Sequence, residues 1–184
     1  MVYIANQWKE NSPTDVRIFS NAEEVELFVN DKSLGRQKPD DNPISSHLNH
    51  PPFTFKISEF HAGTLKAKAY VNSKEVANHI VQTPQQPTKI EVELDLSGYP
   101  LDKNNEDIVF VYAKILDENN TLITDYEGKI KFKIEGNAEL IGKNPTKVKA
   151  GIASILLKSN VNTKDLKIEA KTVDGSLFGK FELK

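Results

Sequence analysis

Carboxylates are the most numerous side chains of this chain that could act as acids or bases, with 26 Asp and Glu residues in all. Some of them alternate with apolar residues, as Glu91 and Glu93 do between Ile90, Val92 and Leu94, and others lie in turns. Alternation places such carboxylates on the solvent face of a strand, and buried acids are rare. A catalytic acid needs an environment that keeps it protonated, which a solvated face does not provide. We therefore expect surface positions, without a catalytic pair, for these acids and for Glu23, Glu24, Glu26, Asp117 and Glu118.

The four histidines do not form a metal-binding or catalytic pattern. His47 and His50 supply only two ligands, whereas a zinc site needs three histidines or two and a carboxylate. His61 lies near a turn, and His79 falls on an alternating run that predicts a half-exposed strand position. Residues 45–47, Ser-Ser-His, have no nucleophile elbow around them, and no glycine run cradles a phosphate. We predict no metal site, no catalytic residues and no cofactor.

Trp8 is the only tryptophan and the one residue that could bind a carbohydrate, because indole faces stack on sugar rings. A tryptophan just before a first strand can instead pack against the edge of its own domain or against a neighbouring domain. Both interpretations of Trp8 remain open from the sequence.

The elements that would position these residues are β-strands. Apolar and polar residues alternate with a period of two, turn residues interrupt the pattern about every ten residues, and no segment has a sustained helical period. Residues 108–116 are almost entirely apolar, which predicts a central strand covered on both faces, with Tyr112 buried within it. The strands are expected near residues 16–20, 25–29, 53–58, 64–71, 75–81, 89–96, 107–117, 129–135, 138–141, 152–158, 166–172 and 177–183.

The length of 184 residues suits two β-sandwich domains of about 90 residues each. Two prolines flank a polar stretch at residues 82–88, so we predict domains at residues 1–83 and 84–184. Residues 39–52 contain four prolines and are expected to form a stiff surface loop. The predicted fold class is all-β, with two tandem immunoglobulin-like β-sandwich domains.

Composition excludes several classes of partner. The net charge of −2 gives no broad positive field, so no nucleic-acid partner is expected. No apolar run is long enough to span a bilayer, and no export signal is visible at the start, so no membrane partner is expected. The absence of cysteine rules out disulfides and thiol chemistry but leaves the compartment undecided.

Several segments of the chain match the motifs of a known family in order and spacing. Residues 15–35 resemble the V-x-x-x-S-N-x-x-x-V-E-L-F-x-N-x-x-S-L-G signature of an immunoglobulin-like module near the C-terminus of glycoside hydrolase family 2 enzymes, the β-galactosidases in particular. Asp31 replaces a turn glycine there, but it tolerates a left-handed backbone. Five downstream segments resemble the invasin-like immunoglobulin module that ends many such enzymes, and residues 52–55 and 62–67 resemble further parts of the first module. The five segments are residues 107–111, 116–119, 130–136, 139–142 and 150–153.

The resemblance implies a non-catalytic C-terminal accessory region of a bacterial β-galactosidase of this family, with a periplasmic or secreted parent. Its partners would be the catalytic (β/α)8 barrel, which carries the catalytic glutamates, and the other domains of the parent chain. A barrel of about 250 residues is absent here, so the fragment itself is expected to be inactive. In the signature strand, Phe28 points away from the buried face and indicates a second covered surface. A carbohydrate-binding or adhesin-like module is the alternative, and it predicts a line of exposed aromatic residues on one sheet face.

Overall fold

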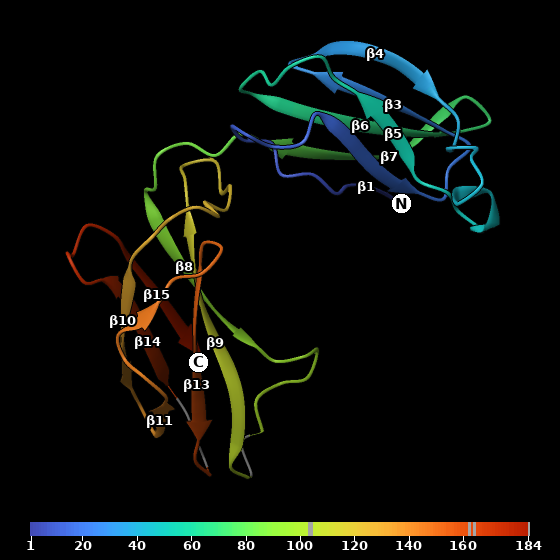
Figure 1. The fold of residues 1–184 in the computed structure, drawn as a ribbon. Helices are drawn as coiled ribbons and strands as arrows, with labels where there is room; N and C mark the ends of the chain where they lie inside the picture. The colour runs from blue at the N-terminus through green and yellow to red at the C-terminus, as the bar shows by residue number, and fades with distance from the viewer. Residues whose placement is uncertain (103–104, 162, 164, 184) are drawn as a thin grey trace. The chain divides into compact units, whose positions relative to one another are not determined.

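All regular structure that is described consists of β-strands, apart from one turn of 3-10 helix. The structure is a computed structural model that describes residues 1–102, 105–161, 163 and 165–183. The described chain forms two compact units, Met1–Pro84 and Gln85–Lys184, each of which is a pair of β-sheets (Figure 1). It contains no helix long and apolar enough to cross a membrane. The all-β sandwich prediction is confirmed.

The first unit pairs a three-stranded sheet, β1-β2-β5, with a four-stranded sheet, β4-β3-β6-β7. Every strand pair in it is antiparallel. A shared cluster of buried side chains from both sheets, including Ile18, Phe53, Leu27 and Leu65, forms the core. The strands are β1 (Val2–Ile4), β2 (Asp15–Ser20), β3 (Glu24–Val29), β4 (Lys32–Gln37), β5 (Phe53–Lys56), β6 (Thr64–Val71) and β7 (Lys74–Gln82).

Alternation and turn chemistry explain why the signature segment folds as a hairpin. Val25, Leu27 and Val29 of β3 are buried, as the sequence predicts. Asn30 and Asp31 follow with φ angles of 47° and 65°, so the turn into β4 uses two residues that tolerate a left-handed backbone. The hairpin therefore needs no glycine at its tip.

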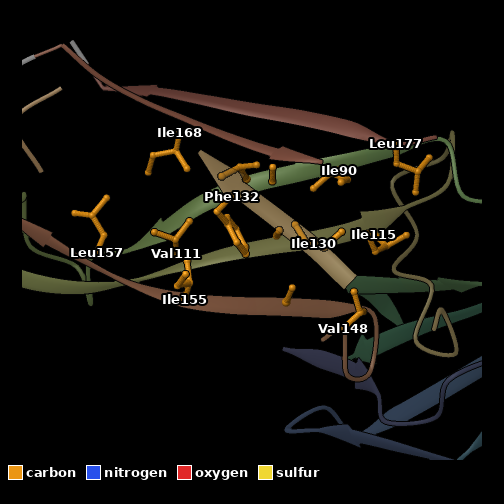
Figure 2. Packing of buried hydrophobic residues seen from close by; sticks show 14 of the residues in the cluster. Ile90, Val111, Ile115, Ile130, Phe132, Val148, Ile155, Leu157, Ile168 and Leu177 are labelled. Atoms are coloured by element: carbon orange, nitrogen blue, oxygen red, sulfur yellow. The ribbon is translucent and has the colours of Figure 1, made fainter. Parts of the chain in front are cut away.

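The second unit pairs two four-stranded sheets, β12-β10-β14-β15 and β11-β13-β9-β8. Figure 2 shows the side chains that fill the space between them, among them Phe132, Ile130, Ile155 and Leu157. The strands are β8 (Lys89–Asp95), β9 (Asp107–Leu116), β10 (Lys129–Glu135), β11 (Ala138–Ile141), β12 (Thr146–Lys147), β13 (Ile152–Ser159), β14 (Leu166–Thr172) and β15 (Phe178–Leu183).

Three strands and one burial pattern differ from the sequence-based expectation. β1, β4 and β12 were not predicted, because they are short or, like the fully exposed β4, lack alternation. The prediction that residues 108–116 are covered on both faces is wrong. β9 does have a hydrogen-bonded neighbour on each side, but its outer face is open at the start of the strand, where Ile108 and Phe110 are 56% and 46% exposed, and covered only at its end, where Leu116 is 4% exposed. Tyr112, expected to be buried, is only half-buried on that same face.

The proline-rich loop at residues 39–52 is held at its base by one aspartate. The Asp40 carboxylate accepts hydrogen bonds from the Thr54 backbone N–H at 3.0 Å and from the Thr54 hydroxyl at 2.6 Å. The backbone N–H of Asp40 also donates to the carbonyl of Pro52 at 2.8 Å. A short 3-10 helix, Ser45–His47, sits within the loop, and His47 and His50 are exposed.

Asp117 was expected at the surface, and this expectation is wrong, because its side chain is fully buried. Its carboxylate accepts hydrogen bonds from the backbone N–H groups of Gln85, Asn119 and Thr121, at 2.8 to 2.9 Å. Burial alone raises the pKa of this carboxyl, but these N–H groups outweigh burial and hold the pKa below its ordinary value. The charged form of Asp117 thus ties the start of the second unit to the turn after β9.

Replacing Asp117 with asparagine is expected to destabilise the second unit by about 2 kcal/mol at pH 7, because hydrogen bonds to a charged acceptor are lost. A group whose pKa is depressed by folding stabilises the fold above its unfolded pKa, and this contribution disappears as the pH falls through the folded value. The difference between the parent chain and Asp117→Asn should therefore shrink from pH 7 to pH 3. Urea unfolding followed by circular dichroism at both pH values measures it.

Asp125→Asn, at an exposed position, is the matched control for the removal of one charge. A difference for Asp117→Asn that stays constant between pH 7 and pH 3 would contradict a role for the ionised carboxylate.

Candidate functional site

Trp8 lies inside the first unit and has no exposed surface. Its indole N–H donates a hydrogen bond to the carbonyl of His61 at 2.8 Å, and its ring packs against Phe60 with the centroids 4.9 Å apart. A sugar ring could stack on Trp8 only if core side chains moved away. The structure thus places Trp8 in the core of its own unit, and the candidate carbohydrate contact has no open ring face.

The histidines make separate contacts, and His79 is the one that packs against β1. The ring nitrogen Nδ1 of His79 accepts a hydrogen bond from the backbone N–H of Ile4 at 3.2 Å, and the ring lies 4.9 Å from that of Tyr3. Burial lowers the pKa of His79, so this imidazole favours the neutral form that can accept a hydrogen bond. In the residues that the structure describes, no three His, Asp or Glu side chains gather as metal ligands.

A polar network covers part of the outer face of β3, around Glu26. The hydroxyls of Ser33 and Tyr70 donate to the two oxygens of this carboxylate at 2.6 and 2.9 Å. The Arg36 guanidinium lies over the Tyr70 ring, 3.6 Å from its centroid. The hydrogen bond from Ser33 is the main cause that lowers the pKa of Glu26. Phe28, the apolar residue on this face, is half-buried and has the Lys68 ammonium 5.7 Å from its ring.

A row of apolar and aromatic residues lies on the outer face of the β11-β13-β9-β8 sheet. Phe110 and Tyr112 project from β9, and their rings are nearly parallel, with an interplanar angle of 6° and centroids 5.8 Å apart. Ile108 extends this row along the strand, and the loop residue Tyr99 is 78% exposed. We call Tyr99, Ile108, Phe110 and Tyr112 the β9 face.

An open hollow of about 410 Å³ lies at the β9 face, lined in part by Tyr99, Ile108 and Phe110. Asp95 and Asp107 also line it, and the Tyr112 hydroxyl donates weakly to Asp95 at 3.4 Å. The sequence did not predict this site. The period of two places residues 108, 110 and 112 on one face of the strand, but it does not predict which of the two faces is exposed.

Two family models match the chain, one in each unit. A domain of unknown function, DUF4982, matches residues 11–77. The glycoside hydrolase family 2 C-terminal domain 5 matches residues 90–175.

Relatives of the chain are much longer proteins. A β-galactosidase from Thermoanaerobacter pseudethanolicus is 30% identical over 179 residues, covering 92% of this chain and 24% of the relative. A putative β-glucuronidase from Formosa agariphila is 30% identical over 149 residues, covering 77% of this chain and 13% of the relative. The chain therefore spans about a quarter, or less, of the length of these relatives.

Solved structures share the fold. The chain aligns over its full length with 24% of a β-glycosidase from Bacteroides vulgatus, with a TM-score of 0.79 and 19% sequence identity. The family match in the second unit, the two longer relatives and this shared fold agree with the resemblance stated from the sequence. The chain belongs to the C-terminal region of glycoside hydrolase family 2 proteins.

Proposed function

We propose that this chain is the non-catalytic accessory region of a family 2 β-galactosidase and that its two domains, at residues 1–83 and 84–184, support the catalytic barrel of the parent enzyme. The observation that carries the proposal is the match of nearly the whole chain to 24% of a β-galactosidase. The rest of that relative has no counterpart here and is long enough to contain a barrel of about 250 residues.

The carboxylates of the chain support a non-catalytic role. A retaining glycosidase needs two carboxyl groups about 5–5.5 Å apart, one of them with a raised pKa. Each described carboxyl group whose pKa differs clearly from its ordinary value has a lowered pKa. Hydrogen bonding by Thr172 and Ser176 lowers the pKa of Asp174 to about 2, and Glu26 and Asp117 are held by the bonds described above. These groups are fitted to accept hydrogen bonds, not to deliver a proton.

The β9 face is our candidate for the surface that contacts the parent enzyme. Adjacent exposed apolar side chains on a soluble domain mark interaction sites, and Ile108, Phe110 and Tyr99 are all at least 46% exposed. In a family 2 parent, one of the other domains would cover this face. Such domains are expected because the β-galactosidase relative is about four times as long as the matched region. Burial of these rings would stabilise the multidomain enzyme.

Phe110→Ser in the complete enzyme tests this function. The substitution is expected to lower the melting temperature of the enzyme by several degrees, because burial of an aromatic ring at an interface is lost, and to leave the isolated chain almost unchanged. Ile44→Ser is the matched control, since Ile44 is 85% exposed and lies in the proline-rich loop. The isolated chain is expected to hydrolyse neither nitrophenyl β-galactoside nor nitrophenyl β-glucuronide. Equal melting temperatures for the Phe110 and Ile44 variants, or turnover that stays with the purified chain, would overturn the proposal.

The carbohydrate-binding alternative has one observation in its favour, the nearly parallel Phe110 and Tyr112 rings on an open sheet face. Galactosides titrated into the isolated chain separate the two functions. Saturable binding that Phe110→Ser abolishes would favour the binding module over the supporting role.

A further inference from the structure

A second surface, on the opposite sheet of the second unit, carries charge that its own neighbours do not balance. The outer side chains of β10, β14 and β15 form rows across the sheet, because these strands pair in register. In one row, Lys133 pairs with Glu169 and Glu169 with Lys180, so the charges alternate. In the row beside it, Lys131 lies directly opposite Lys171, and Lys171 lies opposite Phe178.

The opposed lysines have no carboxylate partner among the ion pairs of the described residues. Lys133 and Lys180 do, since their ammonium groups lie 2.7 Å from Glu135 and 3.4 Å from Glu182. Like charges directly opposite each other on a sheet destabilise it. An anion bound between the two ammonium groups would offset this repulsion.

An open hollow of about 730 Å³ lies at these two lysines. Its volume is in the range of small-ligand clefts, roughly 300–1,000 Å³. Phe178 and Val173, which are 49% and 64% exposed, form an apolar part of its lining. Gly175 also lines it and lies beside Lys171, where an added Cβ would stand 3.3 Å from the Lys171 ammonium nitrogen. The hollow thus combines two unpaired cations with an aromatic wall.

Two carboxylates at the hollow decide which kind of anion fits. Glu169 and Asp174 line it together with Lys131, Lys133 and Lys171. Carboxylates repel any anion, so they favour an anion that also carries hydroxyl groups able to donate hydrogen bonds to them. A sugar unit that carries one anionic group, several hydroxyls and an apolar ring face matches the cations, the carboxylates and Phe178 at once.

We infer that the hollow between Lys131 and Lys171 binds an acidic saccharide, with the carboxylate or sulfate of the sugar between the two ammonium groups and its ring against Phe178. This site lies on a different sheet from the β9 face, so the experiment below tests it independently of the supporting role. It would hold an acidic glycan close to the enzyme without any catalytic group of its own.

Calorimetric titration of the 184-residue chain with trigalacturonate at low salt tests the inference. Galactotriose is the neutral probe and sodium sulfate the free anion. Saturable binding is expected for trigalacturonate and not for galactotriose. The double variant Lys131→Gln/Lys171→Gln is expected to bind trigalacturonate at least about tenfold more weakly, because both charge-assisted bonds are lost.

The matched control is Lys167→Gln/Lys180→Gln, which removes two charges from the same face but from positions opposite glutamates. It should bind within about twofold of the parent chain, since the anion does not contact these lysines. The Lys131/Lys171 variant should unfold at the same or a higher denaturant concentration than the parent, because a repulsive pair is removed. Phe178→Leu should weaken trigalacturonate binding and leave any sulfate binding unchanged.

Three results would overturn the inference. Equal losses in the two double variants would mean that only the general positive field of the sheet attracts the ligand. Binding of trigalacturonate no tighter than that of sulfate, with no effect of Phe178→Leu, would mean a site for simple anions and not for a saccharide. Absence of saturable binding would exclude the site altogether.

Discussion

Replacing Trp8 with alanine is expected to destabilise the first unit by about 3–5 kcal/mol, the range seen when a large buried aromatic is truncated. The indole has no exposed surface, packs against Phe60 and donates to the carbonyl of His61 at 2.8 Å. Alanine removes all three contributions and leaves a cavity. Because each unit has its own core, the transition of the second unit should stay where it is, so that unfolding of the variant proceeds in two steps.

Circular dichroism during urea unfolding measures this effect, since the variant lacks the only tryptophan that could report by fluorescence. Trp8→Phe keeps an aromatic ring and loses the hydrogen bond, so it should cost less, about 1–2 kcal/mol. Phe19→Ala is the matched control, because Phe19 is 45% exposed in the same unit. A loss for Trp8→Ala no larger than that for Phe19→Ala would contradict the core position of the indole.

Gly179→Ala is expected to destabilise the second unit by about 3 kcal/mol or more, which is at the upper end for overpacking of a core. Gly179 lies on β15, and Ile90 lies on β8 of the other sheet. A Cβ on Gly179 would stand 2.0 Å from the carbonyl oxygen of Ile90 and 2.7 Å from its carbonyl carbon. Both atoms are backbone, so relief requires the edges of the two sheets to move apart.

Gly98→Ala separates this steric effect from the conformational preference of glycine. Gly98 has a φ angle of 83° and no atom within 4 Å of an added Cβ, so alanine there costs only the left-handed backbone, about 1–2 kcal/mol. Gly179 is not among the described residues with a positive φ angle, so the loss of stability on Gly179→Ala should come from the clash alone. Thermal unfolding of both variants compares them, and a smaller shift for Gly179→Ala than for Gly98→Ala would refute the close approach of the two sheets.

Most strands could be predicted because alternation is a local property of the chain. A strand places successive side chains on opposite faces, so the alternation of apolar and polar residues predicts the strands Lys129–Glu135 and Leu166–Thr172. β4 could not be found in this way. All of its residues are exposed, and its ladder with β3 and the contact of Arg36 with Tyr70 hold it in place. The burial of Asp117 could not be predicted for a related reason. The N–H groups that hydrogen-bond its carboxylate come from the turn and from Gln85, which is 32 residues away.

By itself, the sequence determined the fold class, the buried face of the signature strand and the resemblance to family 2 modules, because period, turn residues and motif order are local properties of the chain. Only the tertiary structure decided which side chains meet. Trp8 is covered because Phe60 packs on its ring, whereas Phe110 is 46% exposed because it lies on the open first half of the outer face of β9. Lys131 and Lys171 are 40 positions apart in sequence and become neighbours only through the register of β10 with β14. Register depends on pairing between distant segments, and local periodicity carries no information about that pairing.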